Sequence, residues 1–181
     1  CSAAISACEK GAEWQLAIAL LDSMPQRRFE PDIISCNSAI GACEKSAQWQ
    51  SALALFDSIP QLRLQPDVFS CSAAMSACEK GAQWQFALAL LDSMPRLRVR
   101  PNLISFNAAV AACRMGAQWK FALMLLACMP QRQVQPTVIT CNAAIASCEK
   151  GAQQHILLDL FRSTADFGRS ELIELCCQGD V

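Results

Sequence analysis

The sequence repeats itself with a strict period of 35 residues. The octapeptide ACEKGAQW at 77–84 has four close copies, ACEKGAEW, ACEKSAQW, ACRMGAQW and SCEKGAQQ, and successive copies start 35 residues apart. Segments 33–67 and 68–102 are identical at 21 of 35 positions. A catalytic site needs its chemical groups once, whereas a repeat architecture needs its packing unit many times. The period therefore predicts a stack of similar structural units.

Each unit contains two segments with helical periodicity. In 35–45 and 48–59, apolar residues recur at i, i+3, i+4 and i+7, as on one face of an α-helix. They are Cys36, Ala39, Ile40 and Cys43 in the first segment and Trp49, Ala52, Leu53 and Phe56 in the second. A Ser-Ala or Gly-Ala turn separates the segments, and a Met-Pro or Ile-Pro pair ends the second, because proline cannot continue a helix. We expect one helical hairpin per unit.

A hairpin of this size cannot bury two apolar stripes alone, but stacking on its neighbours buries both. We therefore expect an all-α fold, a right-handed α-solenoid (superhelix) of stacked helix-turn-helix repeats that forms one domain over 1–181. The units run 1–32 (truncated at its start), 33–67, 68–102, 103–137 and a degenerate 138–172. The last unit, with Gln154 in place of tryptophan, is either a cap or a decayed repeat. Because the chain opens in mid-repeat at Cys1, we expect a fragment of a longer protein.

The composition excludes several classes of protein. Hydrophobic residues make up 53% and charged residues 17% of the chain, which excludes a disordered, solvating sequence. No apolar run approaches the roughly 18 residues that a membrane span needs, so we expect no membrane partner. The formal net charge of −1 provides no bulk electrostatic argument for nucleic acid. Such a partner must be argued from local geometry.

Twelve cysteines could indicate a disulfide framework, but their spacing argues for another role. Four pairs are seven residues apart, which places both members on the inward face of one helix, where free cysteine acts as a small hydrophobe. These pairs are Cys1 and Cys8, Cys36 and Cys43, Cys71 and Cys78, and Cys141 and Cys148. There is no C-x-x-C motif and a single histidine, His155. We expect no metal, no cofactor and a reducing compartment.

The exposed face of each first helix shows restricted variation. In 33–67 the face opposite the core carries Asn37, Gly41, Glu44 and Lys45. The position of Asn37 is Asn or Ser in every unit, which is typical of a selectable contact more than of packing. The position of Gly41 is always small, and we expect it to keep a groove open.

The chain resembles the pentatricopeptide repeat family, up to about residue 163. The resemblance lies in the 35-residue period, the opening IISCNSAI at 33–40, the second-helix motif at 52–56 and the Pro-Asp ending at 31–32 and 66–67. The tetratricopeptide repeats, which usually bind proteins, have a period of about 34 residues. Two departures fall on packing faces. Cysteine at Cys36, Cys71 and Cys141 stands where the family usually has an aromatic residue, to which Phe106 conforms, and tryptophan replaces a usual leucine.

The resemblance implies binding of single-stranded RNA, one base per repeat, with the amino-terminal end toward the RNA 5′ end. It implies an adaptor in RNA processing, stability or translation, and location in a mitochondrion or plastid rests on the resemblance alone. We expect no enzyme, because nothing resembles an active site and the tail 164–181 is too short for the carboxyl-terminal domains with which relatives edit or cut RNA.

The resemblance also assigns roles to individual residues. The base-reading residues would be an Asn or Ser early in the first helix and the polar residue after the final proline of the unit: Ser2, Asp32, Asn37, Asp67, Ser72, Asn102, Asn107, Thr137 and Asn142. The residues that sandwich the bases would be Ile34, Phe69, Ile104 and Ile139. The residues near the phosphates would be Lys10, Lys45, Lys80 and Lys150. Unit 103–137 has Met115 at the lysine position, preceded by Arg114.

The chemistry of the side chains suggests which bases these pairs would select. Asp accepts the imino N–H of guanine or uracil, whereas Asn has the donor that adenine and cytosine require. Ser leaves space for a purine, and the longer Asn suits a pyrimidine. Ser2 with Asp32 then suggests G, Asn37 with Asp67 suggests U, Ser72 with Asn102 suggests A, and Asn107 with Thr137 suggests either pyrimidine. The expected core is 5′-GUA(C/U)-3′, and Asn142 has no clear partner, since the equivalent position is Leu172.

Simpler interpretations compete with these roles. Asp32 and Asp67 precede helices and would serve as N-caps, alone or in addition. Ser35, Ser70, Ser105 and Thr140 fit helix-start hydroxyls. The lysines would be solvated helix ends favoured by the helix dipole. The tryptophans Trp14, Trp49, Trp84 and Trp119 look like a stacking platform, but their register predicts burial in the core. A protein-binding scaffold that holds a peptide in its groove, and an array with no retained partner, remain alternatives.

Overall fold

The computed structural model describes residues 2–27 and 29–150, and this part of the chain is helical. The first helices of the units are α1 (Ser2–Gly11), α3 (Ile33–Lys45), α5 (Val68–Lys80), α7 (Leu103–Met115) and α9 (Val138–Lys150). The second helices are α2 (Trp14–Ser23), α4 (Trp49–Ser58), α6 (Trp84–Ser93) and α8 (Trp119–Cys128). Short 3-10 helices, η1 (Pro25–Arg27) and η2 (Pro130–Arg132), follow α2 and α8. The expected hairpins are confirmed.

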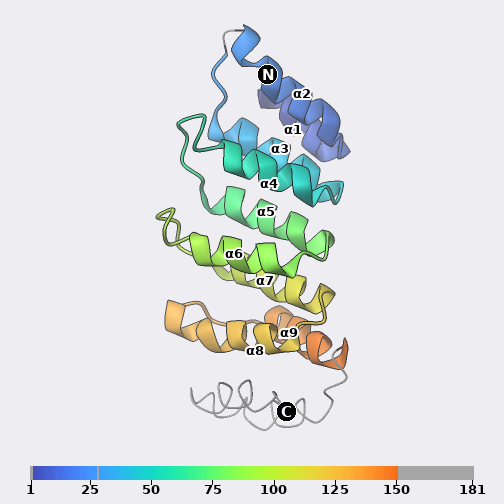
Figure 1. The fold of residues 1–181 in the computed structure, drawn as a ribbon, viewed down its shortest axis with the longest axis vertical. Coiled ribbons are helices and arrows are strands. Elements are labelled where there is room, and N and C mark those ends of the chain that lie inside the picture. Colours follow the sequence, from blue (N-terminus) through green and yellow to red (C-terminus); the bar gives the residue numbers. More distant parts are fainter. Residues whose placement is uncertain (1, 28, 151–181) are drawn as a thin grey trace.

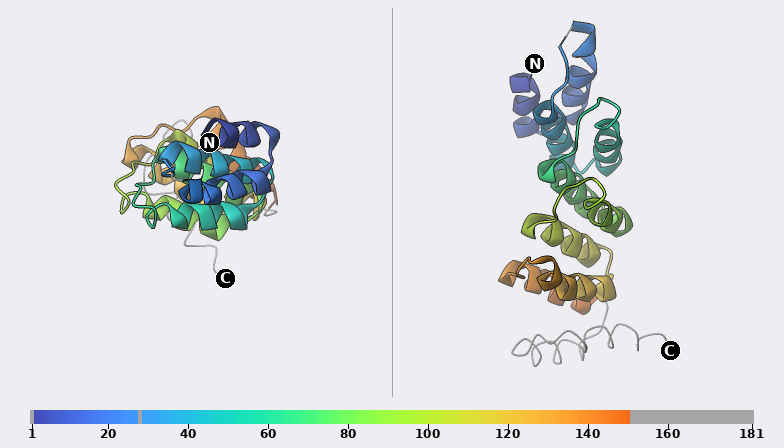
Figure 2. Two further views of the ribbon diagram at one scale, coloured as in Figure 1. Left: turned by 90° about the horizontal axis from the view of Figure 1, so that it is seen from above. Right: turned by 90° about the vertical axis from the view of Figure 1, so that its left-hand side faces the viewer.

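The hairpins stack in chain order along the long axis (Figure 1). Each first helix packs against the first helices before and after it, and each second helix packs against its own first helix and the next one. Among the described elements, no two second helices approach at the backbone. The stack is therefore more closely spaced on the first-helix side. Seen from above, the units largely overlap, and the side view shows their elongated arrangement (Figure 2). This is the all-α solenoid that the period predicts.

The first helices begin at side-chain caps. Asp32, Asp67 and Asn102 each accept a hydrogen bond from the backbone N–H three residues later, at 2.8, 2.8 and 3.0 Å. At Asp67 the bond is reciprocal, because Ser70 Oγ accepts from the Asp67 N–H and completes a capping box. The N-cap interpretation is thus confirmed at Asp32 and Asp67, and Asn102 caps its helix in the same way. Such caps typically stabilise a helix by about 1 kcal/mol.

The first helices end in a left-handed residue that is alanine in four units. In α5, Gln83 N donates to Cys78 O at 2.8 Å and Ala82 N donates to Glu79 O at 3.0 Å, the two bonds of a Schellman motif. Ala82 has φ 54°, where glycine is usual, and Ala12, Ala47 and Ala117 share this conformation. The glycine of the turn, Gly81, lies one residue earlier at φ −82°. Its role is therefore not the left-handed turn.

That glycine makes room for the preceding unit. A Cβ on Gly81 would lie 2.4 Å from Trp49 Cδ1, and one on Gly116 would lie 2.3 Å from Trp84 Cδ1. Each tryptophan thus covers the turn of the next unit and is only partly buried. Its ring also contacts a phenylalanine of the next second helix. The ring centroids of Trp49 and Phe86 are 5.5 Å apart, and those of Trp84 and Phe121 are 5.1 Å apart. The tryptophans pack against the core, as their register predicts, but they are only partly buried and reach across unit boundaries.

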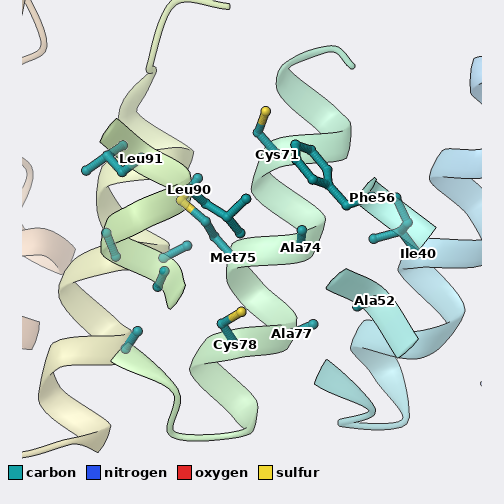
Figure 3. Close-up of a cluster of buried hydrophobic side chains, with 14 of the residues drawn as sticks. Ile40, Ala52, Phe56, Cys71, Ala74, Met75, Ala77, Cys78, Leu90 and Leu91 are labelled. Carbon is teal, nitrogen blue, oxygen red and sulfur yellow. The ribbon is translucent and has the colours of Figure 1, made fainter. Parts of the chain in front are cut away.

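The core runs continuously between the two helix layers. Figure 3 shows Ile40, Phe56 and Met75 on successive helices, with alanines and cysteines between them. Ile40 and Met75 are fully buried, and burying a side chain of this size contributes about 1.5–3 kcal/mol. The small residues allow adjacent first helices to pack closely. Because most core positions are apolar in each unit, the boundaries share a similar core.

The cysteines are part of this core. The buried members are Cys8, Cys36, Cys43, Cys71, Cys78, Cys113 and Cys148. Burial raises the pKa of Cys43, Cys71 and Cys78 to about 11 and that of Cys113 to about 12. The neutral thiols thus act as small hydrophobes, as their spacing predicts. None of the helices in 2–27 and 29–150 has both the length and the apolar character needed to span a bilayer.

Candidate nucleic-acid interface

The residues predicted to read one base come from different units and meet at a shared hydroxyl. Asn37 Nδ2 donates to both carboxylate oxygens of Asp67 at 3.2 Å. Ser70 Oγ lies 2.6 Å from Asn37 Oδ1 and 3.0 Å from Asp67 Oδ1. The Ser70 hydroxyl therefore bridges the first helix of one unit to the N-cap of the next. We refer to Asn37, Asp67 and Ser70 as a polar triad.

The same triad recurs at the neighbouring boundaries. Ser35 Oγ lies 3.0 Å from Ser2 Oγ, while the Ser35 N–H donates to Asp32. Ser105 Oγ lies 3.3 Å from Ser72 Oγ and 3.0 Å from Asn102 Oδ1. Thr140 Oγ1 lies 2.6 Å from Asn107 Oδ1 and 3.0 Å from Thr137 Oγ1. The structure thus brings together all four predicted pairs: Ser2 with Asp32, Asn37 with Asp67, Ser72 with Asn102, and Asn107 with Thr137.

The sequence predicts only a helix-start role for the bridging hydroxyls. Ser35, Ser70, Ser105 and Thr140 are fully buried, which neither capping nor solvation requires. Their recurrence at one position per unit was visible in the sequence, but the contact with the preceding unit was not. They fix the rotamers of the polar pair before any ligand arrives.

The four boundaries differ in how accessible the first-helix residue is. Asn37 and Asn107 are half-buried, whereas Ser72 is only 9% exposed. The shorter serine is therefore less accessible than the asparagines at the equivalent position of the other units. Asn142 is exposed, and its expected counterpart Leu172 lies outside the described residues.

The residues predicted to sandwich bases point into solvent. Ile34, Phe69, Ile104 and Ile139 are 64%, 70%, 58% and 71% exposed. Each precedes the first-helix polar residue by three positions, so the apolar and polar side chains share one helix face. Exposed large apolar side chains in a regular row indicate a surface that binds something.

Two of the four lysines predicted to lie near phosphates form ion pairs between successive first helices, which we call the lysine ladder. Lys45 Nζ lies 3.3 Å from Glu9 Oε1, and Lys80 Nζ lies 3.1 Å from Glu44 Oε1. Lys10 is exposed, and the side chain of Lys150 lies outside the described residues. Exposed pairs of this kind contribute little to stability.

The ladder changes at unit 103–137, where Met115 replaces the lysine. Desolvation raises the pKa of Glu79, and the charge of Arg114 opposes this shift. Arg114 thus supplies the positive charge from the adjacent helical position.

The groove expected at Gly41 is absent. Gly41 is buried, and a Cβ there would lie 3.1 Å from the side chain of Glu9 in the preceding unit. The small residue therefore makes room for the glutamate of the ladder, and the prediction of an open groove at this position is wrong.

The triads have the donors and acceptors needed to bind polar planar groups. Hydrogen bonds from the hydroxyl and backbone N–H of Ser35 lower the pKa of Asp32 and keep it ionised at neutral pH. Within 2–27 and 29–150, no group of three or more His, Cys, Asp or Glu residues could hold a metal ion. The surface is thus a row of repeated hydrogen-bonding sites separated by apolar side chains.

Three overlapping matches to the pentatricopeptide repeat domain cover residues 19–80, 54–116 and 90–151. The chain belongs to the pentatricopeptide repeat family. A comparison with curated proteins finds no match.

Solved structures of pentatricopeptide repeat proteins share the fold. The repeat domain of Arabidopsis thaliana protein-only RNase P 1, in complex with tRNA, is 13% identical with a TM-score of 0.71, over 96% of this chain and 93% of that domain. Maize PPR10 is 16% identical with a TM-score of 0.76, over 94% of this chain and 24% of PPR10. PPR10 in complex with an 18-nt psaJ RNA element is 18% identical with a TM-score of 0.70, over 99% of this chain and 28% of PPR10. At these identities the likeness concerns the fold alone.

Proposed function

We propose that this pentatricopeptide repeat chain binds single-stranded RNA, with one base at each polar triad, and acts as an adaptor without catalytic activity of its own. The observation that carries the proposal is the recurrence of the triad at four successive boundaries, beside an exposed apolar row. Two of the similar structures are complexes with RNA, one with tRNA and one with an 18-nt element. Single-stranded RNA offers bases that stack on apolar side chains and expose their hydrogen-bonding edges.

The base would lie between the apolar side chains of adjacent units. For the base at Asn37, these are Ile34 and Phe69, which are 64% and 70% exposed. Stacking on apolar surface is available to every base and provides affinity without selection. Selection would come from the base edge, which meets Asn37 and Asp67.

The triad is preorganised for this reading. The Asp67 carboxylate oxygens already accept from Asn37 and from Ser70, so their orientation is fixed in the free protein. A carboxylate accepts the imino N–H of uracil, whereas cytosine presents an acceptor that it repels. A wrong base would therefore cover these half-buried polar groups without pairing them, at a cost of about 1–3 kcal/mol. The proposed core sequence is 5′-GUA(C/U)-3′, in the order of the units.

Asp67→Asn tests the proposal at one base. The variant should fold, since asparagine caps the equivalent helix at Asn102 with a 3.0 Å bond to Ser105 N. The ratio of affinities for U and C at the second base should shift toward C by about tenfold or more, because the amide supplies the donor that cytosine needs. Binding to RNAs that vary only at this base, followed by fluorescence anisotropy, measures the ratio.

Asp57→Asn is the matched control. Asp57 lies exposed on α4 and makes no hydrogen bond or ion pair within the described chain, so the same charge change should leave the U/C ratio unaltered. A scrambled RNA should bind more weakly than one that contains GUAC or GUAU. If the scrambled RNA binds equally well and Asp67→Asn changes no preference, the triads do not read bases. A peptide partner would then be the better explanation of the exposed row.

A further inference from the structure

A second polar site lies where the units are joined, outside the row of triads. An open pocket of about 460 Å³ lies between the loops after α6 and α8, which belong to units 68–102 and 103–137. The loops that join successive units lie along the left edge of the stack in Figure 1, opposite the turns within the hairpins. The pocket is therefore at the end of the first helices where the triads lie, and the lysine ladder is at the other end.

Three arginines and two glutamines line this pocket, and no acidic residue does so. The lining includes Arg98, Arg100, Arg132, Gln131 and Gln133. The side chains of these three arginines make no hydrogen bond or ion pair within 2–27 and 29–150. By contrast, Lys45 and Lys80 are paired with glutamates. The pocket thus brings together three arginine side chains that no acidic residue of the described chain pairs with.

Backbone hydrogen bonds within the two loops hold these arginines in place. Arg98 N donates to Pro95 O at 3.1 Å, and Val99 N donates to Met94 O at 2.9 Å. The second loop repeats the pattern, with Gln133 N on Pro130 O at 3.0 Å and Val134 N on Met129 O at 3.0 Å. The two loops are thus anchored to the ends of their helices. Their arginines converge on one space without a large conformational change.

The size and chemistry of the pocket suit a phosphate group. A guanidinium forms paired hydrogen bonds to phosphate oxygens and keeps its charge at any relevant pH. The pocket volume of 460 Å³ far exceeds the roughly 10–15 Å³ that one water molecule needs on the same measure, so a phosphate with part of its ribose fits. Pro101, on the pocket wall, is followed directly by Asn102 of the third triad. The pocket is therefore one residue from a proposed base site.

We propose that this loop pocket binds a phosphate of the RNA backbone, between the nucleotides held by units 68–102 and 103–137. The proposal rests on the RNA binding proposed above and adds to it a contact that does not depend on base identity. The arginines hold the strand in register beside the third and fourth triads. The other loops repeat this charge only partly, since Gln65 and Gln135 stand at the position of Arg100.

Single substitutions to glutamine test the pocket, because other units of this chain already have glutamine at the equivalent positions. Arg98→Gln introduces the residue found at Gln133, which has the same left-handed backbone, φ 61° against 59°. Arg100→Gln introduces the residue found at Gln65 and Gln135. Each variant of the full chain should bind a GUAC-containing RNA about tenfold more weakly. The plot of the logarithm of the association constant against the logarithm of the salt concentration should become less steep by about 0.7 for one lost phosphate contact. The ratio of affinities for U and C at the second base should stay unchanged.

Arg96→Gln is the control. It removes the same charge from the same loop, but Arg96 does not line the pocket and pairs with Asp92 at 3.3 Å. Its affinity and salt slope should match those of the unaltered chain. If all three variants lose the same affinity for the RNA, the effect depends only on the net charge of the chain, and the proposal is overturned.

A neutral linkage locates the contact. Replacing the phosphodiester between A and C of GUAC by a methylphosphonate should weaken RNA binding by the unaltered chain and by Arg96→Gln. The same replacement should not further weaken RNA binding by Arg100→Gln. Additive losses in Arg100→Gln would place the phosphate elsewhere and refute the pocket. If the unaltered chain binds no RNA, the proposed function fails, and calorimetry with inorganic tripolyphosphate then tests the pocket alone. If tripolyphosphate binds and both Arg98→Gln and Arg100→Gln weaken that binding, the pocket is an anion site. If tripolyphosphate does not bind, the anion site is rejected.

Discussion

The contact between Trp49 and Gly81 allows a test of how the units are held together. Replacing Gly81 by alanine would place a Cβ 2.4 Å from Trp49 Cδ1 and 2.7 Å from Trp49 Cγ, closer than real Cβ atoms approach. The indole must move away from the turn, and overpacking of this kind costs about 1–3 kcal/mol. Alanine opposes the loss through its lower unfolded-state entropy, by about 0.4–1 kcal/mol. We expect a net destabilisation of about 1–2 kcal/mol.

Gly11 provides the control within the same chain. It ends the first helix of its unit as Gly81's turn does, but a Cβ there would meet only Glu13 Cγ at an ordinary 3.5 Å. Gly11→Ala should therefore leave stability unchanged or raise it by up to about 1 kcal/mol. Urea unfolding followed by circular dichroism measures both variants, and tryptophan fluorescence reports the environment of the displaced ring.

A rescue experiment separates the packing argument from a general intolerance of the turn. Trp49→Leu removes the ring that the new methyl group would meet, so Gly81→Ala should cost little in that background. Gly116, whose Cβ would lie 2.3 Å from Trp84 Cδ1, should behave like Gly81. If Gly81→Ala proves as stable as Gly11→Ala, the close approach of the tryptophan does not determine the residue at this position.

Two further substitutions test other features of the unit. Ala82→Gly should raise the free energy of unfolding by about 0.5–1 kcal/mol, because φ 54° strains alanine and not glycine; an unchanged urea midpoint would contradict this. Glu79 has a raised pKa through desolvation, so its contribution to stability is present below the unfolded pKa and is lost as pH rises through the folded pKa. Glu79→Gln should therefore stabilise the chain more at pH 7 than at pH 4, and unfolding curves with the same difference at both pH values would refute the assignment.

The sequence predicted most of what lies within one unit. The apolar spacing in 35–45 and 48–59 predicted two helices, which the structure gives as Ile33–Lys45 and Trp49–Ser58. The spacing of Cys36 and Cys43 predicted their shared burial. These features depend on one helix and its apolar face, which a periodic pattern describes well.

What the sequence did not predict lies between units. The register of Trp49 within its helix pointed to the core, but the ring extends to the turn at Gly81. Gly41 suggested a groove, but Glu9 of the preceding unit fills the space. The bridge from Ser70 to Asn37 was missed for the same reason. A period shows that two positions are equivalent, but it does not show which side chain of one unit meets which side chain of the next.

The ring contacts between second helices have a mechanical consequence. Trp49 and Trp84 each meet a phenylalanine of the following second helix, at 5.5 and 5.1 Å. The corresponding residue of α4, opposite Trp14, is Ser51, which has no ring to offer. We therefore expect the boundary between units 1–32 and 33–67 to separate first when the array is pulled along its axis. The two boundaries that follow are each held by an additional contact between aromatic rings.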